Sequence, residues 1–341
     1  MEKILLNEQE YYDQFVQSSK AFLNQELINK IKNANLLIVG AGSIGNPTAI
    51  EAVRAGFTNL TIMDLDTVEV GNLSRQHYSV HQCGKNKAEA TVENLRLINP
   101  YIRAQYVSEG MTFENSNYYI DNADIIIDAI DIKSLDIIFE LHQRAVMLRK
   151  PVLVGYDLAG TAMVVVYRYD KGKQKPLEGK ITDKSIIEFN QVNRAYKDGI
   201  ISSDKFVNYI YGAFNGPINP LTVPVEQLKE LINRKDDDKT YQIGTTASVI
   251  ASLMVEACRR ILNGEEVKKI ITVDIPGKVR KSNPSIFNRL ILLSKVLPVM
   301  NIRKKEIKLI RLSEMQVFLL FLIVLEFLKL LDWNTIRKTT F

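Results

Sequence analysis

The stretch IVGAGSIGNPTAIEAVRAG, residues 38–56, decides the fold. An apolar run leads into three glycines, Gly40, Gly42 and Gly45, and small and apolar residues at helical spacing follow. This pattern is typical of a buried strand, a tight turn and a helix, an arrangement in which backbone N–H groups and the helix dipole face a phosphate. The turn alone does not choose among NAD, FAD, ATP and a turn without a ligand.

Strands and helices alternate along the chain around this turn. Apolar runs predict strands at 35–42, 59–66, 102–109, 123–131, 151–160 and 161–170. Helical periodicity predicts one or two helices within residues 8–34 and further helices at 43–56, 85–99 and 134–149. The alternation indicates an α/β fold, a Rossmann-like doubly wound and mainly parallel sheet preceded by N-terminal helices.

Changes in composition and hydrophobic patterning divide the chain into three parts. We predict a helical segment at 1–33, a nucleotide-binding domain at 34–277 with an insertion at 171–240, and a basic and apolar helical tail at 278–341. The lysine-rich, turn-prone residues 171–240 are an insertion, because core patterning resumes after them. A helix at 244–266, capped by Thr245 or Thr246, and a closing strand at 267–277 complete the predicted domain.

Charge and cysteine content narrow the class of protein. The net charge of +5 is uneven, since residues 278–311 hold ten Lys/Arg and one Glu and leave the rest of the chain at −4. The chain outside residues 278–311 therefore does not resemble a nucleic-acid-binding surface. Cys83 and Cys258 lie far apart, which excludes a disulfide framework and a four-cysteine zinc site within this chain. With no secretory signal in residues 1–20, we expect a cytoplasmic protein without structural zinc.

The tail contains a strongly apolar run at 317–325. Its nine residues, interrupted by Glu326 and Lys329, fall short of the roughly twenty that cross a bilayer. One interpretation is a buried or partner-covered helix. The other is a peripheral membrane-surface anchor, assisted by the basic residues 301–308.

The loop at residues 64–90 narrows the choice of nucleotide. Asp64 ends the second predicted strand and can hold a ribose, which NAD and ATP share. The loop then supplies Asn72, Arg75, Gln76, Lys85 and Lys87. Arg offers a planar fork for phosphate oxygens and Lys a point charge. A hydride-transfer enzyme needs an apolar slot instead, so the loop favours a triphosphate over NAD.

Five motifs in order carry a resemblance to a known family. They are GAGSIGNPTAIEAVRAG, LTIMDLDTVEVGNLSRQ, GKNKAEA, LINP and DIIIDAID. The chain resembles the ThiF/MoeB/HesA superfamily, bacterial relatives of ubiquitin-activating enzymes, over about residues 20–165 and 244–277. The resemblance implies a homodimer that binds ATP and Mg²⁺. It also implies adenylation of a carboxylate, usually the C-terminal glycine of a small ubiquitin-like protein.

The resemblance also implies roles for individual residues. Gly40, Gly42 and Gly45 would cradle phosphate, Asp64 would hold the ribose, Asn72, Arg75, Gln76 and Lys87 would contact the phosphates, and Asp131 would serve Mg²⁺ and α-phosphate chemistry. Asp131, Arg75 and Lys87 are the predicted catalytic residues. An Asp after a buried strand is also often only a helix cap, here for a helix near Ser134.

The chain departs from the family pattern in two places. Many relatives carry an N-terminal Arg that reaches the partner subunit's ATP, whereas this chain has no Arg before Arg54, and Lys20 is the candidate substitute. Relatives also tend to have Asn directly after the catalytic Asp and an Arg a few residues on, whereas this chain has Ile132, Lys133 and Ser134.

The cysteines and histidines offer no second catalytic group. Cys258 is predicted to be core, and Cys83, beside the phosphates, is the remaining candidate for a reactive thiol. His77 and His81 are expected to be hydrogen-bonding loop residues, and no His lies in a recognisable triad. A carboxylate is already ionised at neutral pH, so its adenylation needs no general base.

The leading hypothesis is ATP-dependent adenylation of a carboxylate on a ubiquitin-like carrier protein or a precursor peptide. The length of the insertion favours a specialised substrate such as a precursor peptide. The alternatives are an enzyme like tRNA threonylcarbamoyladenosine dehydratase, whose tRNA would meet the basic tail, an NAD-dependent dehydrogenase, and a nucleotide-binding partner without catalysis.

Overall fold

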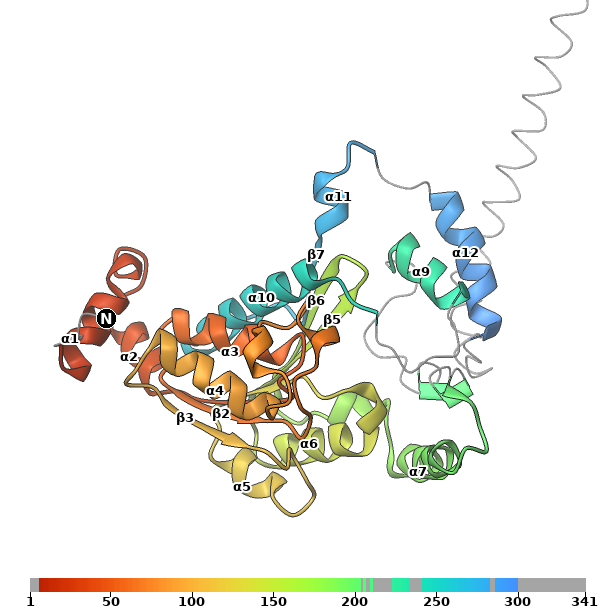
Figure 1. The fold of residues 1–341 in the computed structure, drawn as a ribbon, viewed down its shortest axis with the longest axis horizontal. Coiled ribbons are helices and arrows are strands. Elements are labelled where there is room, and N and C mark those ends of the chain that lie inside the picture. The colour runs from red at the N-terminus through yellow and green to blue at the C-terminus, as the bar shows by residue number, and fades with distance from the viewer. Residues whose placement is uncertain are drawn as a thin grey trace, which may run out of the picture.

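Seven strands form a single sheet in the order β3-β2-β1-β4-β5-β6-β7 (Figure 1). They are β1 (Asn35–Val39), β2 (Asn59–Met63), β3 (Arg103–Val107), β4 (Ile125–Asp128), β5 (Val152–Leu158), β6 (Thr161–Tyr167) and β7 (Ile270–Asp274). The computed structural model describes residues 6–203, 205–206, 209–210, 223–233, 241–282 and 286–299. Strands β1 to β5 are parallel, and β6 and β7 are antiparallel to their neighbours. The predicted α/β, mainly parallel sheet is confirmed.

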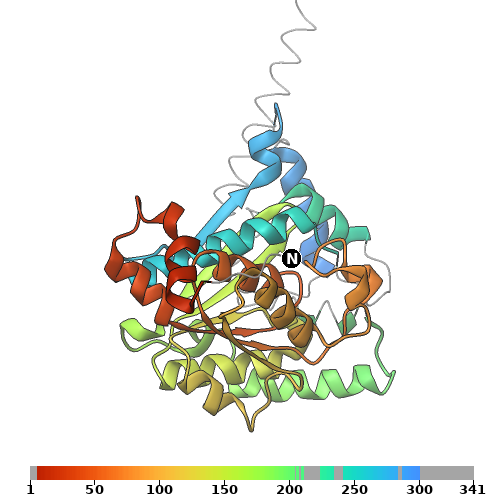
Figure 2. The same cartoon turned by 60° about the vertical axis from the view of Figure 1, so that its left-hand side comes forward.

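Helices cover both faces of the sheet, which the two views show as layers (Figures 1 and 2). The principal helices are α1 (Glu8–Phe15), α2 (Gln25–Asn33), α3 (Gly45–Arg54), α4 (Lys87–Ile98), α5 (Ser116–Asp121), α6 (Leu135–Met147), α7 (Asp183–Lys197), α9 (Val225–Asn233), α10 (Gly244–Leu262), α11 (Ile275–Val279) and α12 (Ile286–Val299). One apolar core joins α2, α3, α4 and α10 to the sheet, and a second joins α5, α6 and α7 to its other face.

The central strand β1 shows why these residues form a strand in a covered sheet. Leu36 and Ile38 enter the core beneath α3 and α10, whereas Leu37 and Val39 enter the core beneath α6. Both faces are buried, so the run is continuously apolar rather than alternating. Because β1 to β5 are parallel, their carboxyl ends meet at one edge of the sheet, where α/β folds place ligands.

The change to antiparallel pairing occurs at a two-residue turn between β5 and β6. Ala159 and Gly160 both have positive φ, 48° and 97°, while Leu158 pairs with Thr161. Positive φ at both central positions is the geometry that suits the twist of a hairpin. The turn reverses the chain into β6, after which the inserted segment, residues 171–240, begins.

The start of α10 differs from the prediction. Neither Thr245 nor Thr246 caps the helix, since Ile243 occupies the N-cap position and no side chain caps it. Thr246 is buried inside the first turn. A Cβ on Gly244 would lie 2.5 Å from the Ser74 carbonyl oxygen, so close backbone packing fixes this helix end in place of a side-chain cap.

The inserted segment and the tail are described only in part. Within them α9 packs against α12 through Val223, Leu228, Leu293 and Val296. The predicted apolar run at 317–325 lies outside the described residues. Among the helices described, none combines the length and the apolar character needed to cross a bilayer. The proposed division of the chain into three parts stays a prediction.

Candidate functional site

The glycine turn, residues 40–45, lies at the carboxyl end of β1 and opens α3. Gly40 has φ +96°, and a Cβ there would lie 2.2 Å from the Ala129 carbonyl oxygen. A Cβ on Gly45 would lie 1.7 Å from the Gly40 carbonyl oxygen. Gly42 is different, because a Cβ there would meet only Gln76 Nε2, at 3.9 Å. Two glycines are thus required for packing, and Gly42 leaves room at a helix N-terminus that lacks a side-chain cap.

Asp64 ties the end of β2 to this turn. Its Oδ2 accepts a hydrogen bond from the Ala41 N–H at 2.6 Å, and its Oδ1 accepts one from the Asp66 N–H at 2.8 Å. Burial raises the pKa of the Asp64 carboxyl, and these two N–H groups and the Lys87 charge oppose that rise. The structure therefore places the predicted ribose residue beside the glycine turn.

The arginine loop, residues 72–76, lies across from the glycine turn. Asn72 is buried, and its Oδ1 accepts a hydrogen bond from the Glu69 N–H at 3.0 Å, which holds the loop closed. Gln76 is buried as well, with Nε2 directed at Gly42. Its Oε1 has no hydrogen-bond partner among the described residues. A buried polar atom without a partner beside an open glycine is what a site for a polar ligand would contain.

Arg75 projects from the same loop and is half-buried. Its Nε donates to Gln242 Oε1 at 3.1 Å, and its Nη1 donates to the Gly71 carbonyl oxygen at 2.8 Å. Ser43 Oγ in the glycine turn donates to the same Gln242 oxygen at 2.7 Å. The guanidinium is thereby connected to the glycine turn through one amide oxygen.

Lys87 begins α4 and is buried, with Nζ 2.8 Å from Asp66 Oδ2. Lys85, from the same loop, forms an ion pair with Glu93 of α4, with its Nζ 2.6 Å from Glu93 Oε1. Of the two lysines, Lys87 alone lies where its charge acts on Asp64.

Asp131 follows β4 and is exposed at the same edge of the sheet. Its Oδ1 accepts a hydrogen bond from the Lys133 N–H at 2.9 Å, so Asp131 caps the short 3₁₀ turn Ile132–Ser134. The helix α6 itself begins at Leu135 without a side-chain cap. The capping alternative is thus observed for the turn ahead of α6, and a carboxylate with a second oxygen can cap and still face a ligand.

A buried polar chain beneath Asp131 was missed by sequence reasoning. His142 is fully buried, with Nε2 3.2 Å from Asp128 Oδ2 and Nδ1 2.8 Å from the Tyr169 hydroxyl. That hydroxyl accepts a hydrogen bond from the Leu177 N–H, so its own hydrogen is available to Nδ1 and the Nε2 hydrogen to Asp128. Asp128 Oδ1 in turn accepts from the Ile130 N–H, which shapes the turn before Asp131.

Gln242 was also missed. It lies 199 residues from Ser43 and 167 residues from Arg75 along the chain, so no local spacing could indicate either contact. The one available signal for His142 was its position among apolar residues of a predicted helix, downstream of the Asp128 to Asp131 motif.

His77 and Cys258 lie as predicted. His77 is a hydrogen-bonding loop residue, with its N–H donating to Asn46 Oδ1 and its ring Nε2 3.3 Å from Ser248 Oγ. Cys258 belongs to the core, and burial raises the pKa of its thiol to about 12. Cys83 is partly buried against Val68 and Tyr78.

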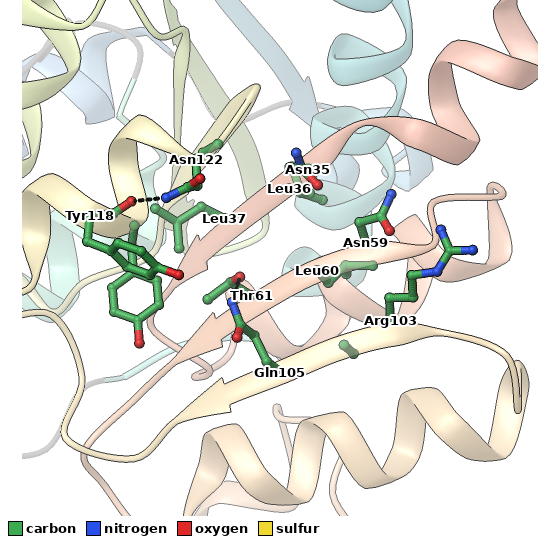
Figure 3. A pocket seen from close by; sticks show the side chains of 13 residues that line it. Asn35, Leu36, Leu37, Asn59, Leu60, Thr61, Arg103, Gln105, Tyr118 and Asn122 are labelled. Carbon is green, nitrogen blue, oxygen red and sulfur yellow. Dashed lines mark hydrogen bonds between the residues drawn. The ribbon is translucent and has the colours of Figure 1, made fainter.

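A hollow of about 470 Å³ lies elsewhere on the sheet and contains none of the predicted site residues (Figure 3). It is lined by the first residues of β1, β2 and β3, with Tyr118 of α5 and Asn122, which follows α5, on one side. Gln105 crosses its floor and donates to Thr61 Oγ1 at 2.8 Å.

Across the ranges that the structure describes, no three His, Cys, Asp or Glu side chains are grouped as a metal site. Mg²⁺ at a nucleotide site does not require such a group, because it is held by one or two carboxylates, phosphate oxygens and water. The carboxylate of Asp131 fits that donor set.

Comparisons with known proteins add a family to this geometry. The adenylyltransferase and sulfurtransferase MOCS3 of Drosophila persimilis is 35% identical over 144 residues, 42% of this chain and 32% of that protein. MOCS3 of Anopheles gambiae is 31% identical over 144 residues, with the same two shares. This chain thus spans about a third of the length of these curated relatives.

Solved structures share the fold at low identity. The crystal structure of PaaA superposes with a TM-score of 0.54 and 17% identity, covering 84% of this chain and 86% of that one. Escherichia coli tRNA N6-threonylcarbamoyladenosine dehydratase, TcdA, superposes with a TM-score of 0.51 and 18% identity, covering 77% and 98%. A model of the ThiF family matches residues 16–285, which is most of the sequence and contains every site residue described above. The chain therefore belongs to the ThiF family.

Proposed function

We propose that this protein is an ATP-dependent adenylyltransferase that activates a carboxylate on a small carrier protein or a precursor peptide, giving acyl-AMP and pyrophosphate. One observation carries the proposal. The arginine loop converges on the glycine turn, with Gln76 Nε2 over Gly42 and Arg75 joined to Ser43 through Gln242. Hydrogen-bond donors and a cation gathered at an uncapped helix N-terminus suit a polyphosphate.

The residues of the site can be assigned to parts of ATP. The glycine turn would hold the phosphates, and Asp64, anchored to the Ala41 N–H, would accept a ribose hydroxyl. Arg75 and Lys87 would neutralise the triphosphate, for which Lys87 must exchange its present partner Asp66. An ionised carboxylate is repelled by phosphate, so this neutralisation comes before any attack on the α-phosphorus.

Asp131 is the proposed residue for Mg²⁺ and the α-phosphate. It is exposed at the carboxyl end of β4, next to the end of β1 that begins the glycine turn. Mg²⁺, when bound, offsets negative charge on the phosphates and on departing pyrophosphate. The substrate carboxylate is its own nucleophile, which agrees with the burial of His142 away from solvent.

The comparisons support an adenylation reaction and leave its substrate open. The Drosophila and Anopheles relatives are named adenylyltransferases. A precursor peptide is our preferred substrate, because the inserted segment adds helix α7, which packs against α6, and helix α9, which packs against α12. The resemblance also supports a homodimer, in which Lys20, here paired with Asp13 at 3.1 Å, would take the place of the missing N-terminal Arg.

A second candidate is a reaction on tRNA. TcdA shares the fold over 98% of its own length, and residues 278–311 of this chain are strongly basic. Binding of tRNA through this tail would weaken steeply with added salt, since each neutralised phosphate releases counterions. A salt-insensitive interaction, or none, would eliminate this candidate.

The proposal is tested by exchange of labelled pyrophosphate into ATP in the presence of candidate carrier proteins, peptides and tRNA. We expect exchange with one class of substrate in the wild type and its loss in Arg75→Ala and Asp131→Ala. Gln105→Ala is the matched control, because Gln105 lies in the hollow over β1 to β3 and contacts none of these residues. Absence of exchange and of AMP with every substrate class would contradict adenylation.

A further inference from the structure

Gln242 stands at the junction between the inserted segment and α10. Its single oxygen, Oε1, accepts two hydrogen bonds, from Ser43 Oγ at 2.7 Å and from Arg75 Nε at 3.1 Å. It therefore joins the glycine turn to the arginine loop. The only other hydrogen bond of the Arg75 guanidinium within the described residues runs from its Nη1 to the Gly71 carbonyl oxygen, just before the arginine loop.

The return segment, residues 241–244, is fixed directly after Gln242. The Ile243 N–H donates to Asp157 Oδ2 at 3.1 Å, which anchors the segment to the end of β5. Gly244 packs so closely on the arginine loop that a Cβ would lie 2.5 Å from Ser74 O and 3.1 Å from Arg75 Cα. The position of Gln242 is thus set by backbone contacts and does not depend on its own side chain.

The chemistry of the bridging group matters for a phosphate site. An amide oxygen orients a guanidinium without neutralising its positive charge, whereas a carboxylate at the same place would form an ion pair with it. The two hydrogen bonds of the guanidinium engage Nε and Nη1, and within the described residues Nη2 has no partner. The arrangement holds Arg75 in one orientation and keeps its charge for an anion.

We propose that Gln242 is a positioning residue for Arg75, which holds the guanidinium beside the glycine turn and ties it to the end of the inserted segment. This inference rests on the proposed ATP site. Any displacement of the return segment moves the acceptor of Arg75 Nε. The return segment, which follows the inserted segment, therefore reaches the proposed triphosphate site through the Gln242 side chain.

A double-mutant cycle tests this role through the dissociation constant of Mg·ATP, measured by calorimetry on the full chain without any acyl substrate. We expect Arg75→Ala to weaken binding by about tenfold or more and Gln242→Ala by about threefold to tenfold. In the Arg75→Ala background, Gln242→Ala should have no further effect. Additive losses would overturn the inference, because they would show that Gln242 acts independently of Arg75.

A second comparison separates positioning from simple structural support. Gln242→Glu retains an acceptor for Ser43 and Arg75 but neutralises the guanidinium, so it should weaken ATP binding more than Gln242→Ala does. A merely structural role predicts the opposite order, since Glu preserves the contacts. Gln105→Glu adds the same charge in the hollow over β1 to β3 and should leave the dissociation constant unchanged.

The outcomes also distinguish this inference from the proposed function. If the wild type does not bind Mg·ATP, the ATP site fails and the inference falls with it. If the wild type binds Mg·ATP and both Gln242 variants bind equally well, the inference alone fails. Thermal unfolding of each variant identifies any change that comes from loss of the fold.

Discussion

Lys87 Nζ lies 2.8 Å from Asp66 Oδ2, so the buried cation at the start of α4 already has an anionic partner. A phosphate that binds Lys87 must replace this carboxylate, which has an exposed side chain and can turn outward. The pair therefore keeps a desolvated charge compensated while the nucleotide is absent.

We predict opposite effects from the two partners of this pair. Lys87→Ala should weaken Mg·ATP binding by about tenfold or more, because a charge-assisted contact is lost. Asp66→Asn should tighten it by a few-fold, because the competing carboxylate is removed. Calorimetric dissociation constants check both changes. Lys85→Ala is the matched control, since Lys85 pairs with Glu93. Equal effects of the two lysine substitutions would contradict the placement of Lys87 in the site.

The glycines of the turn should separate stability from binding. Gly42→Ala adds, at a backbone conformation that alanine adopts, a methyl group that would make only an ordinary contact with Gln76 Nε2, at 3.9 Å, so thermal unfolding should be unchanged. The methyl group would occupy the predicted phosphate site, and Mg·ATP binding should fall by about tenfold. Gly45→Ala should instead destabilise the fold, because its Cβ would overlap the Gly40 carbonyl oxygen. Gly71→Ala, with nothing near its Cβ, controls for the substitution. Normal ATP affinity in Gly42→Ala would remove the glycine turn from the site.

Asp157 should make stability depend on pH. Burial raises its pKa to about 6, above the value of an exposed Asp, so the native state disfavours the charged form. The unfolded chain releases the proton more readily, and native stability from this group is therefore lost as pH rises through about 6. Asp157→Asn keeps an acceptor for the Ile243 N–H and removes the charge. Its melting temperature should match the wild type near pH 4 and exceed it above pH 6, in thermal scans across this range. A constant difference at all pH values would contradict the assignment.

The buried chain of hydrogen bonds that links Asp128, His142, Tyr169 and the Leu177 N–H should contribute to the stability of the fold. Tyr169→Phe leaves His142 Nδ1 and the Leu177 N–H without their partner, and an unsatisfied buried group costs about 1–3 kcal/mol. Denaturant unfolding should show that loss in the free energy of unfolding. Tyr106→Phe removes a hydroxyl from a half-exposed ring and should have little effect. If the two variants are equally stable, the buried hydrogen bonds of Tyr169 do not stabilise the fold.

Local patterns in the sequence predict the framework of this protein well. Continuous apolar runs such as Leu36 to Val39 mark the covered strands, and the glycine turn marks the helix that follows. Asp64, Arg75, Gln76 and Lys87 are brought to one edge of the sheet because each follows or faces a parallel strand end.

Contacts over long separations explain what the sequence could not predict. Gln242 reaches Arg75 across 167 residues, and Tyr169 reaches His142 from a different element. The helix start at Gly244 is set by the backbone of the arginine loop, which no capping rule describes.

The most direct test of adenylation follows oxygen from the substrate carboxylate. Once exchange has identified the substrate, both of its carboxylate oxygens are labelled with ¹⁸O, and the AMP formed by the wild type is analysed by mass spectrometry. Attack of the carboxylate on the α-phosphorus, followed by cleavage at the acyl carbon, leaves one ¹⁸O in AMP. Labelled AMP that disappears in Asp131→Ala is the result we predict. Unlabelled AMP, or label in ADP or inorganic phosphate, would contradict carboxylate adenylation by this protein.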